Sequence, residues 1–259
     1  MTNDELFSLK DQVALITGGS GDIGMAIAMA YARAGAHIAL HGRRADKLQT
    51  RRSAFASLPV RVEVFPADIS KVATIRQLAH DVVATFGKVD ILVNCAGINR
   101  RKPILEFTEA EYEEIMAVHV RAAFFLSQAI APFMIAQGGG KIIHVGSATI
   151  RTGLADVSVY GMAKASLDAL TRSMAVEWAE HNIQVNCLAP GFLMTEMTRE
   201  GLWGHERRSK WLLDRIPMRR PGLPEEIAAA ALLLASRGSS YLTGQTIYVD
   251  GGFAAGSKW

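Results

Sequence analysis

A tyrosine and a lysine stand four residues apart, at Tyr160 and Lys164, in a segment with a helical pattern. This spacing places both side chains on one face of a helix. A lysine cation close to a phenol favours the phenolate, so it lowers a pKa of about 10 and makes the tyrosine a usable acid and base nearer neutrality. Because such pairs are common by chance, the weight of this one depends on a third residue.

Ser147 supplies that third group. It follows the apolar run Lys141–Val145, which we expect to be a strand. A hydroxyl at this point lies at the carboxyl end of the sheet, where open α/β folds bind their ligands. There it can steady a carbonyl oxygen while Tyr160 delivers the proton.

A glycine-rich loop, TGGSGDIG at residues 17–24, follows an apolar run and precedes a helical pattern. It contains the G-x-G-x-x-G pattern of dinucleotide-binding turns, in which a helix N-terminus receives a pyrophosphate. Asp22 places an acid in this anion-binding loop. We interpret Asp22 as an N-cap whose carboxylate bonds the N–H of Gly24 or Met25. The alternative is that it contacts a cofactor hydroxyl or weakens phosphate binding.

β-rich runs alternate with helical patterns along the chain. This alternation predicts βαβ units and a parallel sheet with helices on both faces. No linker divides the chain, so we expect one domain over residues 1–259. The expected strands are Gln12–Thr17, His37–His41, Val60–Phe65, Val89–Asn94, Gly140–Gly146, Ile183–Leu188 and Gln245–Val249, and the expected helices are 23–34, 45–56, 70–86, 108–136, 158–180 and 224–235.

The segment from Thr195 to Pro221 interrupts this alternation with a long excursion that includes Trp203 and Trp211. Insertions of this length between a strand and a helix are more often functional than idle. We therefore expect residues 195–221 to be a substrate-binding lid. The alternative is a surface appendage or an oligomer contact.

The composition narrows the class of protein. Hydrophobic residues make up 49% of the chain, but no run approaches the twenty or so uncharged apolar residues that span a bilayer, and the N-terminus is acidic where a signal peptide is basic. Cys95 and Cys187 lie in apolar, strand-like contexts without metal-ligand spacing. A net charge of +3, spread along the chain, gives no support to nucleic-acid binding. We expect a cytoplasmic protein without a metal, a membrane or a nucleic-acid partner.

In the order of its motifs the whole chain resembles the classical short-chain dehydrogenases/reductases. The loop at 17–24 matches that family's TGxxxGxG pattern except at Asp22, which replaces the middle glycine. The resemblance implies a Rossmann-like, doubly wound fold with seven parallel strands, a nicotinamide cofactor, a homotetramer and reversible hydride transfer at a carbonyl or secondary alcohol. The other motifs that carry it are Asn94-Cys-Ala-Gly97, Ser147, Tyr160-x-x-x-Lys164, Pro190-Gly191 with Thr195, and Tyr248-Val-Asp-Gly-Gly252.

The resemblance also implies roles for individual residues. Ser147, Tyr160 and Lys164 become the expected catalytic residues, and Lys164 also binds the nicotinamide ribose. Asn94 supports the central sheet, and Asp68 matches the position that contacts adenine. The expected cofactor-binding set is Gly18, Ser20, Asp22, Ile23, Gly24, Arg43, Asp68, Ile69, Asn94, Ala96, Gly97, Tyr160, Lys164, Pro190, Gly191, Leu193 and Thr195.

His119 stands where most members of that family carry an asparagine that completes a catalytic tetrad. In the family this residue positions a helix kink and a water in a proton relay to the lysine. A histidine can donate and accept hydrogen bonds, so the relay can survive with His119 as a catalytic residue. A relay water held by a main-chain carbonyl, or a histidine with no catalytic part, are the alternatives.

The residues after the second expected strand bear on the choice of nicotinamide. A dehydrogenase that uses NAD normally places an acid there to hold the ribose 2′-hydroxyl, and Gly42 occupies that position. The adjacent Arg43 can pair with a 2′-phosphate in a bidentate fork. We therefore favour NADP(H). NAD(H) stays open, because Arg43 and Arg44 can both be solvated and Asp22 can favour an unphosphorylated ribose.

Within the family the chain is most similar to sugar-acid dehydrogenases of the gluconate and deoxygluconate group, in the stretches at 94–101, 177–183 and 214–217. Arg100 and Arg101 follow the fourth strand at the ligand-binding edge, where a substrate carboxylate needs a cation, and Arg151 is a rival for that contact. With Ser147 and Trp203 they are the expected substrate contacts. A 3-oxoacyl-[acyl-carrier-protein] reductase and a nucleotide-binding sensor with vestigial catalysis are the alternatives.

The helix expected over Tyr160–Glu180 also bears on assembly. It carries an apolar stripe at three- and four-residue spacing, through Leu167, Leu170, Met174 and Trp178. The stripe is either part of a subunit interface in the expected homotetramer or part of the core.

Overall fold

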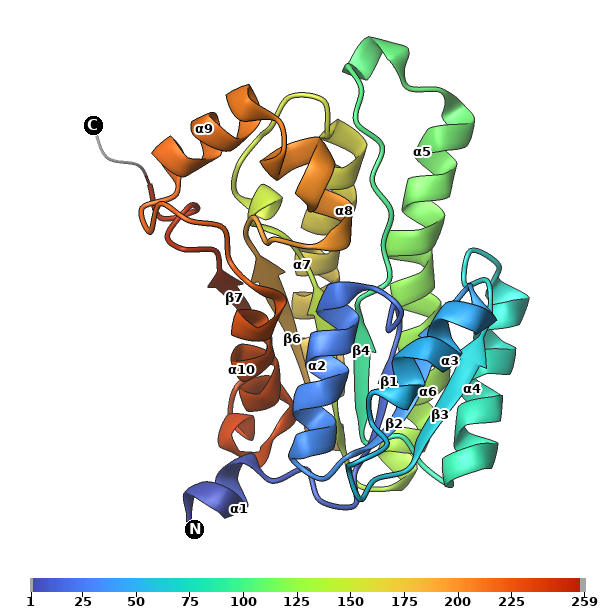
Figure 1. The fold of residues 1–259 in the computed structure, drawn as a ribbon. Coiled ribbons are helices and arrows are strands. Elements are labelled where there is room, and N and C mark those ends of the chain that lie inside the picture. Colours follow the sequence, from blue (N-terminus) through green and yellow to red (C-terminus); the bar gives the residue numbers. More distant parts are fainter. Residues whose placement is uncertain (1, 257–259) are drawn as a thin grey trace.

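A computed structural model describes residues 2–256 and folds them around one parallel sheet (Figure 1). The seven strands lie in the order β3-β2-β1-β4-β5-β6-β7. The predicted doubly wound parallel sheet is therefore confirmed, and each predicted strand run overlaps an observed strand. The strands are β1 Val13–Ile16, β2 His37–Gly42, β3 Val62–Pro66, β4 Ile91–Asn94, β5 Gly140–Val145, β6 Ile183–Pro190 and β7 Thr246–Val249.

The strand order reverses between β1 and β4, and helices cover both faces of the sheet (Figure 1). Open sheets of this kind bind ligands at the carboxyl ends of the strands beside that reversal. The longer helices are α2 Asp22–Arg33, α3 Ala45–Ser53, α4 Val72–Phe86, α5 Glu109–Met116, α6 Ala122–Ala136, α7 Ser158–Trp178, α9 Glu206–Arg215 and α10 Pro224–Ala235. Shorter turns are α1 Asn3–Phe7, α8 Glu196–Thr198, and the segments η1 Ile104–Glu106, η2 Ala117–Arg121, η3 Ala148–Ile150, η4 Ala179–His181, η5 Arg199–Trp203 and η6 Arg237–Ser239.

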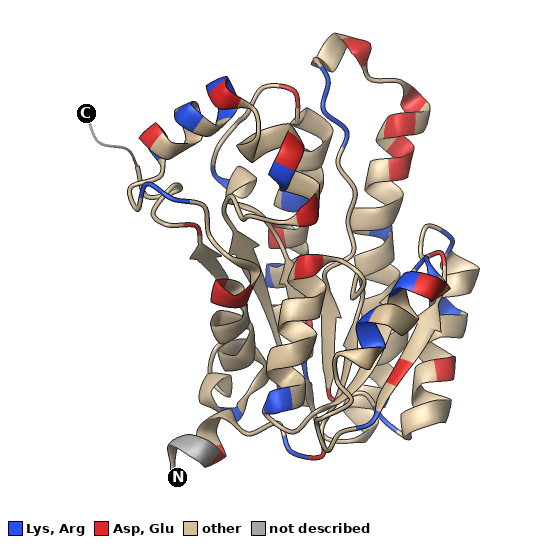
Figure 2. Ribbon diagram, viewed as in Figure 1, with Lys and Arg blue, Asp and Glu red and all other residues tan. Residues whose placement is uncertain are grey.

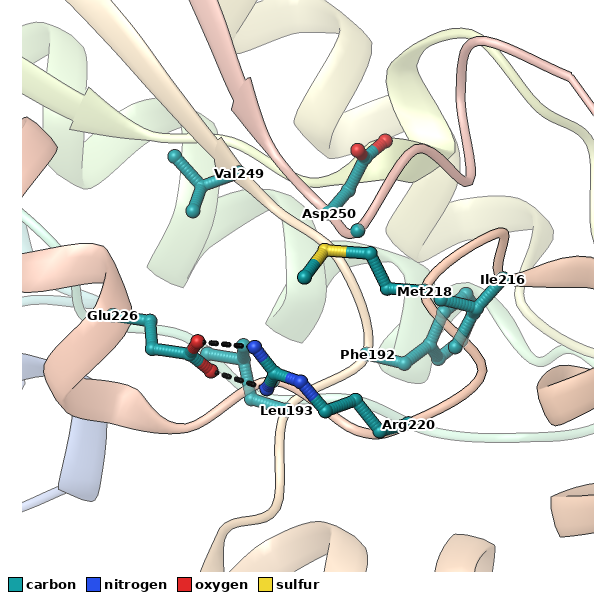
Figure 3. Close-up of a pocket in the computed structure, with 10 residues that line it drawn as sticks. Phe192, Leu193, Ile216, Met218, Arg220, Glu226, Val249 and Asp250 are labelled. Carbon is teal, nitrogen blue, oxygen red and sulfur yellow. Dashed lines mark hydrogen bonds and ion pairs between the residues drawn. The ribbon is translucent and has the colours of Figure 1, made fainter.

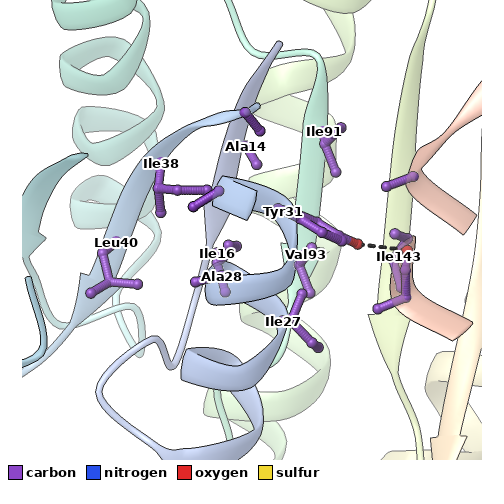
Figure 4. Close-up of a cluster of buried hydrophobic side chains, with 14 of the residues drawn as sticks. Ala14, Ile16, Ile27, Ala28, Tyr31, Ile38, Leu40, Ile91, Val93 and Ile143 are labelled. Carbon is purple, nitrogen blue, oxygen red and sulfur yellow. Dashed lines mark hydrogen bonds between the residues drawn. The ribbon is translucent and has the colours of Figure 1, made fainter. Parts of the chain in front are cut away.

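The core has one hydrophobic cluster on each face of the sheet. The first packs α2 and α10 against the strands (Figure 4) and contains fully buried Tyr31, whose hydroxyl donates to the carbonyl of Ala231 at 2.9 Å. This bond satisfies a polar atom that burial would otherwise leave unpaired. The second cluster packs α4, α6 and α7 against the other face.

Three residues of the apolar stripe of α7, Leu170, Met174 and Trp178, belong to this second cluster, and the fourth, Leu167, is also buried. Leu167 and Met174 are 2% and 4% exposed, and Leu170 and Trp178 pack against the same core. The sequence left open whether this stripe belongs to a subunit interface or to the core, and the structure places it in the core. The large apolar side chains that α7 exposes are Met162 and Val176.

The continuous helical segment Glu109–Ala136 is long and apolar enough, by length and composition alone, to cross a membrane. Its first part, α5, carries four glutamates, and its second part, α6, packs against α4 and the sheet. A core helix of an α/β protein has the same composition, because it buries one face against the strands. We interpret the segment as a core helix.

Residues 195–221 form α8, η5 and α9, which lie over the carboxyl end of β6 (Figure 1). The two ends of this segment are held together at a neck formed by residues 192–194 and Gly222. Leu193 and Gly222 form a parallel bridge there. The N–H of Met194 donates to the carbonyl of Gly222 at 2.8 Å, and the N–H of Gly222 donates to the carbonyl of Phe192 at 3.0 Å. Movement of the segment is therefore restricted to the residues beyond this neck.

A cavity of about 80 Å³ lies beside the neck, between β6, β7 and α10 (Figure 3). Two of its three charged side chains, Arg220 and Glu226, are paired with each other through hydrogen bonds of 2.8 and 2.6 Å. The third, Asp250, accepts the N–H groups of Gly252 and Ala254 at 2.9 and 2.7 Å. Glu226 also accepts the N–H of Leu223 and so caps α10. With its charges satisfied internally, the cavity supports the neck and is separate from the predicted catalytic residues.

Candidate active site

Ser147 and Tyr160 meet because β5 ends next to the first turn of α7. The Ser147 hydroxyl accepts the N–H of Thr149 at 3.2 Å, which begins the turn η3, and it forms a hydrogen bond with the Tyr160 side chain. A substrate oxygen placed here would contact both hydroxyls.

Burial sets the acidity of Tyr160. Loss of water around the phenolate raises the pKa of Tyr160, and the hydrogen bond from Ser147 and the positive charge of Arg101 oppose that rise. The sequence predicted a lowered pKa through Lys164, and this prediction is wrong for the structure as it stands. The physical reason is that desolvation of the charged form outweighs the favourable contacts.

Lys164 is 4% exposed, and its ammonium donates to the carbonyl of Val145 at 2.6 Å. The ammonium lies 5.6 Å from the centroid of the Tyr160 ring. Burial lowers the pKa of Lys164 to about 8. The lysine is therefore held beside the tyrosine by α7, with the β5 carbonyl fixing its direction.

His119 lies on a π-helical turn, η2, that joins α5 to α6. Its Nε2 is 2.7 Å from the carbonyl oxygen and 3.0 Å from the amide nitrogen of Ile98, so the tautomer decides which of the two it bonds. Its Nδ1 is buried without a hydrogen-bond partner among the described residues. Burial, with the charge of Lys164, lowers the pKa of His119 to about 3. The ring is neutral at pH 7, so any part it takes in a proton relay runs through hydrogen bonds of the neutral imidazole.

Gly97 and Asn94 build the wall next to His119. A Cβ added at Gly97 would lie 2.5 Å from His119 Cε1, so only glycine leaves room for the imidazole. The Asn94 amide donates to the Ser127 hydroxyl at 3.1 Å and lies 3.2 Å from Nδ1 of His144. These contacts join β4, β5 and α6 below the site.

The glycine loop fits tightly against the backbone that follows β4. Gly18 has φ +71°, and a Cβ there would lie 2.8 Å from the Cα of Ala96, while one at Gly24 would lie 2.5 Å from the Gly18 carbonyl oxygen. The N–H groups of Cys95 and Ala96 both donate to the Thr17 hydroxyl, at 3.0 and 3.1 Å. The loop leads directly into α2, and the first turn of a helix has N–H groups without partners inside the helix. This cradle fits the pyrophosphate of a dinucleotide.

Asp22 does not cap α2. The N-cap position belongs to Gly21, and Asp22 is the first residue of the helix. Its carboxylate accepts the N–H of Glu196 at 2.6 Å and a hydrogen bond from Arg51 at 2.8 Å. The predicted cap is therefore wrong, because two groups from distant parts of the chain take both carboxylate oxygens.

The other predicted cofactor residues gather at the carboxyl ends of the strands. Arg43 is exposed after β2, Asp68 after β3 accepts the N–H of Ser70 at 3.0 Å, and Ile69 is buried beside it. Pro190 ends β6, and at the next residue, Gly191, a Cβ would lie 2.6 Å from the Cα of Asp250. One edge of the sheet therefore holds groups from β1 through β6.

Leu193 and Thr195 anchor the start of the 195–221 segment. The Leu193 carbonyl accepts the Thr198 hydroxyl at 2.6 Å and the indole N–H of Trp203 at 2.9 Å. Thr195 caps α8 by accepting the N–H of Thr198. Trp203 thus ties η5 to the chain after β6, and it packs against the cluster of Leu202, Leu212, Ile216, Ala148 and Phe253.

The three predicted arginines differ in their surroundings. Arg100 donates twice to one oxygen of Glu114, at 2.9 and 2.6 Å, and so is held against α5. Arg151 stacks over the ring of Tyr248, with its guanidinium carbon 4.7 Å from the ring centroid. Arg101 forms no hydrogen bond or ion pair with the described residues.

The surroundings of Arg101 include Tyr160, the predicted catalytic tyrosine. Although the residue is exposed as a whole, its guanidinium is partly enclosed, and this burial together with the nearby charge of Arg208 lowers the pKa of Arg101. Tyr160 and Asp156 are close enough for their charge to oppose that effect. Figure 2 shows basic residues on the stretch around 100–102 and on α9, above the carboxyl ends of the strands.

Comparison with known proteins agrees with this geometry. Residues 19–254 match the family described as enoyl-(acyl carrier protein) reductase. The 2-dehydro-3-deoxy-D-gluconate 5-dehydrogenase of Escherichia coli (strain K12) is 41% identical over 96% of this chain and 98% of its own length. The chain belongs to the short-chain dehydrogenase/reductase family. It is an NAD(P)-dependent oxidoreductase that acts on CH–OH groups.

Two similar solved structures contain different nicotinamide cofactors, NADP in one and NADH in the other. A gluconate 5-dehydrogenase from Burkholderia cenocepacia J2315, in complex with NADP and tartrate, is 36% identical, with a TM-score of 0.92 over 98% of this chain and 99% of its own. A 7α-hydroxysteroid dehydrogenase with NADH and 7-oxo glycochenodeoxycholic acid is 33% identical, with a TM-score of 0.93 over 97% of this chain and 98% of its own. Fold similarity alone therefore fixes neither the nicotinamide nor the substrate.

Sequence reasoning about this dehydrogenase missed several residues at the site edge. Lys47 and Arg51 on α3 face Asp22 and Glu196, and their four-residue spacing was the available signal for a shared basic face. Arg208 on α9 lies near Arg101. The 195–221 segment contains several arginines and lysines, and the sequence alone does not show which of them approaches Arg101.

Proposed function

We propose that this short-chain dehydrogenase interconverts a sugar acid and its keto form, with a substrate of the gluconate or keto-deoxygluconate class. The observation that carries the proposal is the Arg101 guanidinium, which stands near Tyr160 without a carboxylate bonded to it among the described residues. A partly enclosed cation of this kind favours an anionic group on the substrate. The relatives named for gluconate and keto-deoxygluconate support the same class.

The proposed chemistry assigns one task to each side chain. Ser147 holds the substrate oxygen, and Tyr160 passes a proton to that oxygen or takes one from it. The Lys164 cation stabilises the phenolate form of Tyr160 and keeps the site positive. The bound nicotinamide supplies or accepts the hydride. His119, neutral and hydrogen-bonded to Ile98, holds the π-turn next to the tyrosine.

We infer that NADP(H) is the preferred cofactor. Gly42 stands where an acid would hold a 2′-hydroxyl, and a Cβ there would lie 3.0 Å from the hydroxyl of Ser20. A larger side chain would displace Ser20. The adjacent Arg43 is exposed at the same edge and is free to pair with a 2′-phosphate.

We also infer that residues 195–221 act as the substrate lid. They carry Arg208 toward Arg101, and Trp203 and Leu202 pack on Ala148, which adjoins Ser147. Closure of the lid would exclude water, and exclusion of water strengthens a charge pair between substrate and arginine. The protein is proposed to be a cytoplasmic homotetramer, and the exposed apolar residues Met162 and Val176 on α7 support an interface.

The test of the function is a substrate panel. We expect kcat/KM with NADPH to be highest for a keto-sugar acid, lower for its neutral keto-sugar analogue, and lowest for a ketoacyl thioester. Preference for the thioester would move the assignment to a 3-oxoacyl-[acyl-carrier-protein] reductase. Absence of turnover on every compound, with NADPH still bound, would support a nucleotide-binding sensor.

A further inference from the structure

Asp22 joins three elements that are far apart in the sequence. It is the first residue of α2, and its two carboxylate oxygens accept the N–H of Glu196 on α8, at 2.6 Å, and the guanidinium of Arg51 on α3, at 2.8 Å. The Asp22 and Arg51 side chains are only 23% and 30% exposed. The acid in the nucleotide loop therefore points sideways to the 195–221 segment, with its charge balanced by Arg51.

A second contact reinforces the first. The Glu196 carboxylate pairs with Lys47 on α3 at 2.7 Å. Glu196 is 72% exposed, so this pair is screened by water and contributes little by itself. The bond from the Glu196 N–H to the partly buried Asp22 carboxylate is the stronger one, because charge-assisted hydrogen bonds to a carboxylate are short and strong.

The position of Glu196 gives these contacts a mechanical role. Leu193 is fixed to Gly222 at the neck of the segment, and Glu196 is fixed to Asp22 three residues later. The stretch that includes Leu193 and Thr195 is therefore fastened at both ends, along the N-terminus of α2. Opening this stretch requires the Asp22 bond to break, while the neck can stay in place.

We propose that Asp22 is a positioning residue that fastens the 195–221 segment to the nucleotide loop and slows release of the nicotinamide cofactor. The proposal depends on the family's cofactor and is independent of the sugar-acid substrate proposed above. It accounts for a carboxylate in an anion-binding loop, since the carboxylate faces a backbone N–H and a guanidinium.

The experiment compares Asp22→Ala and Asp22→Asn with the wild type, in the absence of any substrate. Hydrogen exchange of residues 195–203 is measured in the enzyme without cofactor, and the NADPH dissociation rate is measured by stopped-flow displacement. We expect Asp22→Ala to raise both rates about tenfold or more, the size set by one charge-assisted hydrogen bond. Asp22→Asn keeps an acceptor for the Glu196 N–H but loses the charge, so its rates should lie between those of Asp22→Ala and the wild type.

Two further variants complete the test. Asp46 is an acid in the first turn of a different helix, α3. Asp46→Asn is the matched control and should change neither rate. Lys47→Ala, which removes the partner of the exposed Glu196 carboxylate, should raise both rates about twofold. It keeps the test available if Asp22→Ala does not fold.

The results that would overturn the proposal are specific. Unchanged hydrogen exchange in Asp22→Ala would show that Asp22 does not fasten the segment. Faster exchange with an unchanged NADPH dissociation rate would show that the fastening does not control release. Slower dissociation in Asp22→Ala would mean that the carboxylate repels the phosphates.

Discussion

The imidazole of His119 stands edge-on to the ring of Tyr160, with the ring centroids 5.5 Å apart and the planes at 89°. The contact places a buried, neutral histidine against Tyr160, the residue proposed to transfer the proton. Gly97 makes the arrangement possible, because any side chain there would occupy the space of the imidazole.

This relationship predicts a strong coupling between positions 97 and 119. Gly97→Ala should destabilise the enzyme by about 1–3 kcal/mol and reduce kcat, because the added Cβ overpacks the site and displaces His119. In a His119→Ala background the same change should be nearly neutral. A double-mutant cycle of urea unfolding measures the coupling. Equal losses in both backgrounds would show that Gly97 has another role.

Buried histidines predict acid sensitivity. Burial lowers the pKa of His119 and of His144 to about 3, whereas an unfolded histidine titrates at about 6.5. Between those values the unfolded chain binds more protons, so the free energy of unfolding falls as the pH drops below about 6.5, by up to about 1.4 kcal/mol per pH unit for each histidine. Above about pH 6.5 these two histidines do not change the free energy of unfolding with pH.

Urea unfolding between pH 7 and pH 4.5 measures this fall in the free energy of unfolding. His144→Asn should show a decline that is shallower by about 1 kcal/mol per pH unit. His80→Asn, a change at an exposed histidine, is the matched control. A His144→Asn decline as steep as that of the wild type would contradict the buried, neutral ring.

The proton-transfer role predicts a separation of turnover from cofactor binding. Tyr160→Phe should lower kcat by about 10²–10⁴-fold, because general acid–base catalysis is lost, while the Kd for NADPH stays close to that of the wild type. Lys164→Met should lose turnover and also weaken NADPH binding. Single-turnover kinetics and fluorescence titration give the two quantities. Near-normal turnover in Tyr160→Phe would remove Tyr160 from the mechanism.

The proposed 2′-phosphate contact predicts a change in cofactor preference. A charge-assisted bond from Arg43 is worth about 1.5–3 kcal/mol, so Arg43→Ala should lower kcat/KM for NADPH by roughly 10- to 150-fold and leave that for NADH nearly unchanged. Arg44→Ala, at the next position, serves as the control. If the wild type prefers NADH, the preference for NADP(H) is wrong.

The proposed carboxylate contact predicts that the two neighbouring arginines behave differently. Arg101→Ala should reduce kcat/KM for a keto-sugar acid by at least about 30-fold, because the substrate carboxylate loses its partner, and should affect the neutral analogue far less. Arg100→Ala is the matched control, since Arg100 is already paired with Glu114. Equal losses on both substrates would make Arg101 a structural residue.

Much of the fold and of the site could be predicted from the sequence. The apolar runs and the order of the motifs predicted the seven strands, and the spacing of Tyr160 and Lys164 predicted a shared helix face. The glycine loop predicted the cradle at α2. These features depend on local pattern, because period and turn chemistry act over a few residues.

Only the tertiary structure decided which distant groups meet. Asp22 was predicted to cap its own helix, yet it bonds Glu196, which is 174 residues away in the chain. Arg100 and Arg101 are adjacent in sequence, but one is paired with Glu114 and the other stands near Tyr160. Burial, and not the nearby lysine, sets the direction of the Tyr160 pKa shift. Spacing along the chain determines the face on which a side chain lies, while desolvation and pairing depend on what the fold packs against that face.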